Sequence, residues 1–246
     1  MIIELTGNIH FEAVMIFFVL LTALLLSRSY FLAAVPTLTL AIQAKLLPLV
    51  AIPLLIKRFG LIKAGIFGLF CLLTLWLSSP LLWSGLGKLE HLLSSLSLYY
   101  GKFEFNGSLY SVFNAIGWWI AGYNPIWWVS KLMLVLTLTL FALVYYRKPE
   151  FLSGFFYLMS VYFLCSAVVH PWYLAILVAL SPFVPWRFPL AWSAFIPLTY
   201  VTYSTKPYQQ NYWLVGIEYA IVFGVLLYEL NRYGTFNFAS RRIGKL

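Results

Sequence analysis

Aspartate is missing from this sequence altogether, and charge of either sign is scarce. Only 9% of the 246 residues are charged, and the 7 acidic residues are all glutamates. A soluble domain carries about 25% charged residues. A chain with so little charge cannot cover a water-exposed surface with polar groups. The composition therefore excludes an ordinary soluble protein and indicates that lipid surrounds much of the chain.

Cysteine is scarce as well, and familiar catalytic motifs are missing. The 2 cysteines, Cys71 and Cys165, both lie inside apolar runs, where a thiol behaves as a small buried hydrophobe. Neither a disulfide framework nor a thiolate metal site is indicated. The sequence contains no CxxC, HExxH, Walker loop or GxGxxG, so no metal ligand is assigned and nucleotide binding has no motif to support it.

Hydrophobic residues dominate what is present. They make up 63% of the chain, and the mean hydropathy is +0.89. Continuous apolar runs such as 13–26 and 132–144 differ from the alternating segments of about ten residues in a membrane β-barrel. The sequence therefore predicts an all-α, polytopic transmembrane helical bundle.

The net charge of +9 does not indicate nucleic-acid binding. The basic residues form short clusters beside apolar runs, the pattern of the positive-inside rule and of contact with anionic lipid headgroups. Trp and Tyr pairs at the ends of the runs are typical of the membrane interface. We expect a multi-pass membrane protein with a cytoplasmic C-terminus, with membrane lipids and not nucleic acid around it.

Turn and charge signals divide the chain into about nine membrane helices within one domain, residues 1–246. An external loop is expected at about 78–124 and a cytoplasmic tail at 231–246. The other expected spans are 11–27, 61–77, 125–146, 151–169, 171–184, 188–203 and 212–230.

Residues 31–56 are expected to form a short broken hairpin. Basic residues flank them at both ends, Arg28 on one side and Lys57 with Arg58 on the other, and one span cannot have two cytoplasmic ends. Lys45 and Pro48 interrupt the middle. Each arm of about a dozen residues reaches only ~18 Å, less than the ~30 Å hydrocarbon core. Such helices are tolerated where protein or a cavity satisfies the freed backbone.

Ionisable groups beside a span are costly and therefore candidates for function. Asn8, His10 and Glu12 precede the first span. His10 and Glu12 could transfer protons, or bind sugar hydroxyls or a divalent cation, which is the one cofactor left open. The alternative is an ordinary helix start with Asn8 as its N-cap.

Lys45 lies inside the apolar hairpin, where an ammonium needs an anionic partner such as a lipid phosphate. The alternative is that its stem lets the charge reach the interface. His170, Trp172 and Tyr173 sit at an expected external turn, where aromatic rings beside a polar tip suit a sugar; a locally hydrogen-bonded histidine is the other interpretation. Glu104 and Asn106 could bind a polar acceptor or belong to a solvated loop.

Several of these segments together resemble a known group. They are Gly7-Asn8-Ile9-His10-Phe11-Glu12, Ala44-Lys45-Leu46-Leu47-Pro48, Phe103-Glu104-Phe105-Asn106 and His170-Pro171-Trp172-Tyr173. In this order they are similar to segments of bacterial GT-C glycosyltransferases of the mannosyltransferase type, related to glycosyltransferase family 87.

The resemblance implies a GT-C-like fold and transfer of mannose or another hexose from a polyprenyl-phosphate donor to a lipid or glycan acceptor on the external face. It implies catalytic roles for Glu12 and His10. Lys45 would lie near the donor phosphate, and Asn8, Glu104, Asn106, His170, Trp172 and Tyr173 would bind donor or acceptor.

The sequence departs from the family in one respect. GT-C enzymes place a catalytic aspartate in their first external loop, and this chain has no aspartate. We therefore expect the C-terminal portion of a longer enzyme, or a chain whose partner supplies the missing helices. A transporter or flippase of a lipid-linked saccharide and a non-catalytic membrane subunit are the alternatives.

Overall fold

The computed structural model describes residues 10–78, 90, 94, 103–147, 149–204 and 209–233. Within these residues the chain is helical, and the only extended pairing is a pair of isolated bridges that join Phe105 and Asn106 to Val168. The all-α prediction is confirmed for this part of the chain. Residues 79–89, 91–93 and 95–102 of the expected external loop, and residues 234–246 of the expected tail, lie outside the described residues.

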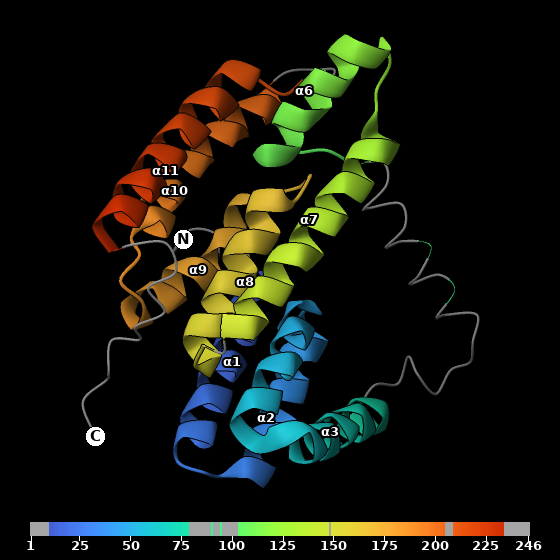
Figure 1. The fold of residues 1–246 in the computed structure, drawn as a ribbon, viewed down its shortest axis with the longest axis vertical. Helices are drawn as coiled ribbons and strands as arrows, with labels where there is room; N and C mark the ends of the chain where they lie inside the picture. Colours follow the sequence, from blue (N-terminus) through green and yellow to red (C-terminus); the bar gives the residue numbers. More distant parts are fainter. Residues whose placement is uncertain are drawn as a thin grey trace.

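The helices form three groups along the long axis of the molecule (Figure 1). At one end α1, α2 and α3 pack in chain order, α7, α8 and α9 lie in the middle, and α6, α10 and α11 lie at the other end. The helices are α1 (Glu12–Ser27), α2 (Phe31–Ala44), α3 (Ile52–Ser78), α6 (Leu109–Ala121), α7 (Ile126–Arg147), α8 (Phe151–Cys165), α9 (Ala175–Leu180), α10 (Phe188–Phe195) and α11 (Tyr212–Tyr233). Short 3₁₀ turns are η2 (Leu47–Ala51), η3 (Pro171–Leu174), η4 (Ser181–Phe183) and η5 (Ile196–Ser204).

The predicted break in residues 31–56 is present. Helix α2 ends where Lys45 adopts an extended conformation, and Pro48 opens η2, because proline suits the first turn of a helix and not its interior. A second break occurs at Gly60, whose φ of 78° lies in the left-handed region that glycine adopts without a Cβ clash. The segment from Leu47 to Phe59 is therefore the short second arm, and the rest of α3 continues to Ser78.

Three helical stretches among the described residues are long and apolar enough to cross a membrane. They are Leu47–Ser78, Ile126–Arg147 and Tyr212–Tyr233. The first corresponds to η2 and α3, the others to α7 and α11. This finding is consistent with a membrane protein, while the number of crossings stays a prediction.

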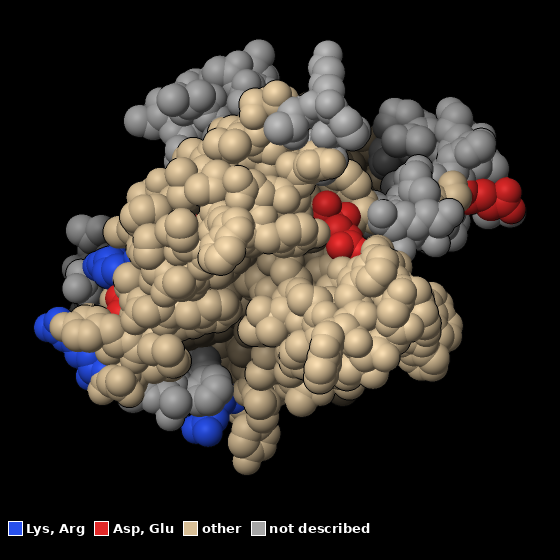
Figure 2. All heavy atoms as spheres, turned by 90° about the horizontal axis from the view of Figure 1, so that it is seen from above, with Lys and Arg blue, Asp and Glu red and all other residues tan. Residues whose placement is uncertain are grey.

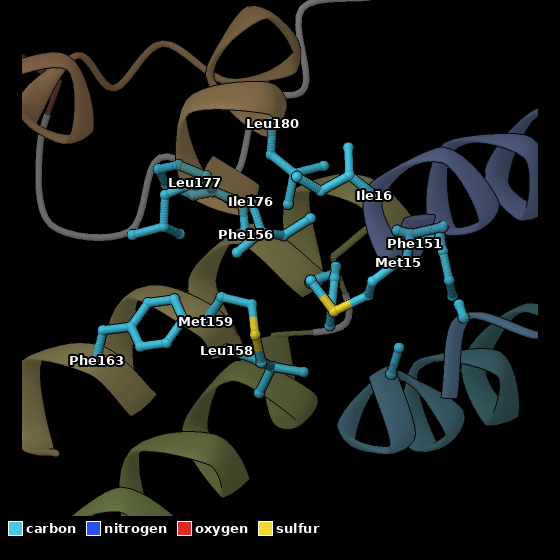
Figure 3. Close-up of a cluster of buried hydrophobic side chains, with 14 of the residues drawn as sticks. Met15, Ile16, Phe151, Phe156, Leu158, Met159, Phe163, Ile176, Leu177 and Leu180 are labelled. Atoms are coloured by element: carbon cyan, nitrogen blue, oxygen red, sulfur yellow. The ribbon is translucent and has the colours of Figure 1, made fainter. Parts of the chain in front are cut away.

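Helix α8 lies at the centre of the packed interior. Figure 3 shows its Phe156, Leu158, Met159 and Phe163 among side chains of α1 and α9. All four have no exposed surface. In lipid, where apolar surface gains little from leaving the solvent, such close packing and interhelical hydrogen bonds hold helices together. Both cysteines are buried and free, as the sequence indicated.

Two expectations about helix boundaries are corrected. The segment expected as an external loop, 78–124, contains the 13-residue helix α6. The segment 171–184, expected as one span, is divided into η3, α9 and η4; Pro182 lacks the amide hydrogen that would continue α9.

Gly117 of α6 lies against Pro125, which leads into α7. A Cβ at residue 117 would lie 2.5 Å from the Cγ atom of Pro125, and a proline ring cannot rotate away. We expect Gly117→Ala to lower the free energy of unfolding by about 1–3 kcal/mol, the usual cost of overpacking. Thermal unfolding in detergent measures this. Gly216→Ala in α11, where a Cβ meets nothing within 4 Å, is the control and should leave stability equal or higher; an equal response of both variants would contradict the prediction.

Candidate functional site

The turn between α1 and α2 brings Glu12 and Lys45 to the same end of the bundle. Ser29, with a φ of 64°, lies in this turn and the two helices pack side by side, joined by a 2.9 Å hydrogen bond from Thr22 to Thr37. Helix α1 therefore begins where α2 ends. A carboxylate at a helix N-terminus and an ammonium at a C-terminus both complement the helix dipoles.

Glu12 and Lys45 form an ion pair in which the Nζ atom of Lys45 donates to Oε1 of Glu12. The Glu12 side chain is 5% exposed and that of Lys45 is 25% exposed. The same Nζ atom lies 3.9 Å from the centre of the Tyr173 ring, close enough for a cation–π contact. The ammonium thus has a carboxylate as one partner and an aromatic face as another.

A stack of rings lies beside this pair. Trp172 stacks with His10 at 4.2 Å between ring centres and with His170 at 4.4 Å. His170 also stacks with Phe105 at 4.7 Å. Tyr173 meets His170 edge to face at 5.2 Å and connects the stack to Lys45. Six predicted site residues with a charge or a ring are therefore neighbours in space: His10, Glu12, Lys45, His170, Trp172 and Tyr173.

The segment before α6 is fixed to the segment before His170 by backbone hydrogen bonds. The amide of Phe105 donates to the carbonyl oxygen of Ala167 over 2.9 Å, and the amide of Val169 donates to the carbonyl oxygen of Phe105 over 2.8 Å. A Cβ on Gly107 would lie 3.1 Å from the carbonyl oxygen of Ser166, so the two chains approach closely there. This pairing is what holds Phe105 against His170.

Glu104 and Asn106, on either side of Phe105, make their contacts away from the ring stack. Glu104 accepts hydrogen bonds from Tyr110 at 2.9 Å, Asn114 at 3.2 Å and Asn124 at 3.3 Å. Asn106 donates to Oε1 of Glu218 over 3.0 Å. Their side chains thus bond to the protein around α6 and α11, and a role in acceptor binding stays a prediction. Asn8 lies outside the described residues.

Glu218 of α11 is a buried carboxylate that the sequence did not single out as a site residue. It has no exposed surface, and its Oε1 accepts hydrogen bonds from Asn106 and, over 2.8 Å, from Trp192. Tyr219 donates to the backbone oxygen of Asn106 over 2.6 Å. This network fixes the 103–106 segment to α10 and α11. The signal that could have identified it is an isolated glutamate in the middle of an apolar helix.

His170 is 9% exposed, and its Nδ1 atom has no hydrogen-bond partner among the described residues. Burial, with smaller contributions from the nearby Lys45 and His10, lowers the pKa of His170 to about 4. The imidazole is therefore neutral at pH 7, with one nitrogen available as an acceptor.

The arrangement offers an ammonium, a carboxylate, imidazoles and aromatic rings, which suit anions, hydroxyl groups and flat apolar faces. In the described part of the chain, no group of three or more His, Cys, Asp or Glu side chains is placed to hold a metal ion. No protein-family model, curated protein or solved structure matches the chain.

The Glu12–Lys45 pair should show energetic coupling. Removing one partner of a buried pair leaves an uncompensated charge and costs about 3–5 kcal/mol when burial is complete. Because Lys45 is partly exposed, we expect Glu12→Gln and Lys45→Met each to cost about 2 kcal/mol, somewhat below that range. The double variant should cost less than the sum of the two. Denaturant unfolding of all four proteins in one detergent measures the coupling; additive losses would show that the pair does not act as a unit.

His170 should make stability depend on pH. Its pKa is lower in the folded protein than its usual value of 6.5, so the unfolded chain binds the extra proton more readily. The contribution to stability is complete above about pH 6.5 and is lost as pH falls toward 4. The His170→Phe variant keeps a stacking ring but cannot bind the proton. We expect its stability to fall less than that of the wild type when the pH is lowered over this range. Equal pH profiles of the unfolding midpoint would contradict the assignment.

Proposed function

We propose that the chain is the membrane domain of a GT-C-like glycosyltransferase of the bacterial plasma membrane. In this proposal it transfers a hexose from a polyprenyl-phosphate donor to a glycan or lipid acceptor at the external face. One observation carries the proposal: the Glu12–Lys45 pair lies beside the His10–Trp172–His170 stack within an apolar helical bundle. Three of the four short segments that resemble the family supply these groups, and the fourth, residues 103–106, supplies Phe105 beside His170.

Lys45 is the group that suits the donor phosphate. An ammonium is a common ligand of phosphate in proteins, and this one sits at a break between apolar helices. In the free protein its charge is balanced by Glu12. A phosphate that reaches Lys45 competes with Glu12 for the same Nζ atom. Donor binding would therefore release the carboxylate from its partner.

A released Glu12 can serve as the base. The acceptor hydroxyl oxygen forms a bond to the anomeric carbon, and the bond from that carbon to the phosphate oxygen breaks. The electron pair leaves with the phosphate, whose charge Lys45 balances, and the hydroxyl proton goes to Glu12 or, as the alternative base, to His10. General-base catalysis of this kind contributes about 10²–10⁴-fold to the rate.

The rings provide a surface for the sugar. Trp172 and Tyr173 are partly exposed, and aromatic faces pack against the C–H groups of a hexose. Neutral His170 offers an acceptor nitrogen for a sugar hydroxyl. These features favour a sugar phosphate over a simple anion, which would use Lys45 alone.

The distribution of charge supports an external location of the site. Helix α1 begins at Glu12 and ends at Ser27, next to exposed Arg28, and Arg58 donates to the Leu26 carbonyl oxygen near the same end. Basic residues favour the cytoplasmic side of a membrane protein. The Glu12 end of α1 would then face outward, where polyprenyl-phosphate donors are used by the family that the sequence resembles.

The test is sugar transfer by the wild type in proteoliposomes supplied with a radiolabelled polyprenyl-phosphate hexose. We expect Glu12→Gln and Lys45→Gln to lose roughly 100-fold or more of the rate, as loss of a base or of phosphate stabilisation predicts. Lys63→Gln, a change at an exposed lysine of α3, is the matched control and should retain activity.

Two results would overturn the proposal. The first is transfer by the Glu12→Gln and Lys45→Gln variants at the rate of the control. The second is a wild type that transfers no sugar from any hexose donor but moves the labelled donor between the two leaflets, which would identify a transporter of a lipid-linked saccharide.

A further inference from the structure

A second polar feature lies at the other ends of the helices that position the site. A cavity of about 450 Å³ is lined by Ser27 at the end of α1, by the short arm before Gly60, and by the start of α8. Its full lining is Ser27, Leu54, Leu55, Lys57, Arg58, Pro149, Glu150 and Phe151. Because α1 spans 16 residues, the cavity and Glu12 are separated by about 24 Å at ~1.5 Å per residue.

The cavity is lined by buried apolar side chains and by exposed side chains of both charges. Leu54, Leu55 and Phe151 are buried, while Lys57, Arg58 and Glu150 are exposed. Arg58 is held in place by its 2.7 Å hydrogen bond to the Leu26 carbonyl oxygen. Among the described residues, neither the ammonium of Lys57 nor the carboxylate of Glu150 has an ion pair. Two cations and one anion therefore line the same space.

The surroundings indicate what such a cavity would meet. Directly after Gly60, Leu61 and Ile62 are 72% and 79% exposed and begin the long apolar part of α3, which is a candidate membrane span. Exposed apolar side chains beside cationic ones are typical of the level where acyl chains meet headgroups. Figure 2, which views the molecule from above, shows Lys and Arg atoms only toward the edges of a mostly uncharged face.

We propose that this cavity binds the headgroup of a phospholipid that carries both a phosphate and a primary ammonium, as in phosphatidylethanolamine. The phosphate lies against Lys57 and Arg58, the ammonium donates to Glu150, and the acyl chains follow the apolar surface of α3. An anionic lipid without an ammonium would place its negative charge near the Glu150 carboxylate and leave that carboxylate unpaired. Such a lipid should therefore bind less well. The cavity shares no residue with the Glu12–Lys45 pair, so the two sites can be tested separately.

The experiment measures lipid retention by native mass spectrometry. The protein is taken from nanodiscs that contain equal amounts of phosphatidylethanolamine, phosphatidylglycerol and phosphatidylcholine. We expect the wild type to retain phosphatidylethanolamine several-fold over phosphatidylcholine, whose quaternary ammonium cannot donate a hydrogen bond. Equal retention of these two lipids by the wild type would overturn the proposal without any variant.

Two variants separate the charges. Lys57→Gln should reduce retention of phosphatidylethanolamine and phosphatidylglycerol alike, because both carry the phosphate. Glu150→Gln should lower the ratio of phosphatidylethanolamine to phosphatidylglycerol several-fold, because only the first carries the ammonium. Lys63→Gln and Glu90→Gln replace exposed residues outside the cavity lining and are the matched controls. An unchanged ratio in Glu150→Gln, or retention in Lys57→Gln equal to that in Lys63→Gln, would overturn the assignment.

Discussion

The Glu12–Lys45 ion pair is the interaction on which the candidate site depends. Two charges in a largely apolar bundle are costly to desolvate, and their attraction repays that cost only when further contacts support them. Here the turn between α1 and α2 supplies the geometry, the two helix dipoles favour both charges, and the Tyr173 ring covers the ammonium at 3.9 Å. The pair therefore links three elements of the fold: the α1–α2 hairpin that brings the two charges together, the break at Lys45, and η3, which carries Tyr173.

The ring stack depends on a different constraint, the backbone pairing between residues 103–106 and 166–169. Two hydrogen bonds of 2.9 and 2.8 Å place Phe105 against His170, and the buried contacts of Asn106 with Glu218 and Tyr219 hold the same segment from the other side. A polar network inside apolar helices is stable only when its members are bonded to one another. Phe105 stacks with His170 and Asn106 donates to Glu218, so this segment joins the ring stack to α11.

Much of this could be predicted from the sequence. Apolar runs and the Lys45–Pro48 interruption indicated the helices and the broken hairpin, since proline and a charge act locally. Charged or aromatic side chains next to apolar runs were the signal for the candidate site residues, which are His10, Glu12, Lys45, His170, Trp172 and Tyr173. Helix α6 was not predicted, because it is short and the polar residues before and after it led the whole segment 78–124 to be assigned to a loop. The network at Glu218 was missed because Asn106 reaches it across 112 positions, and no periodicity reports a contact of that kind.

Helices α1 and α8 place opposite chemistry at their two ends. Glu12 opens α1 and the chain after α8 leads to His170, whereas Ser27 closes α1 and Phe151 opens α8 at the basic cavity. Both helices contribute to the close-packed interior (Figure 3), and such an interior transmits displacement because it has little free volume. Arg58 of α3 bonds to the Leu26 carbonyl oxygen of α1, so a displacement of α1 at this end would reach Glu12 through the helix. In the proposed mechanism, the Glu12 carboxylate leaves Lys45 when a phosphate binds. The contacts that fix α1 at the cavity, next to Ser27, would then contribute to the affinity of the site for that phosphate.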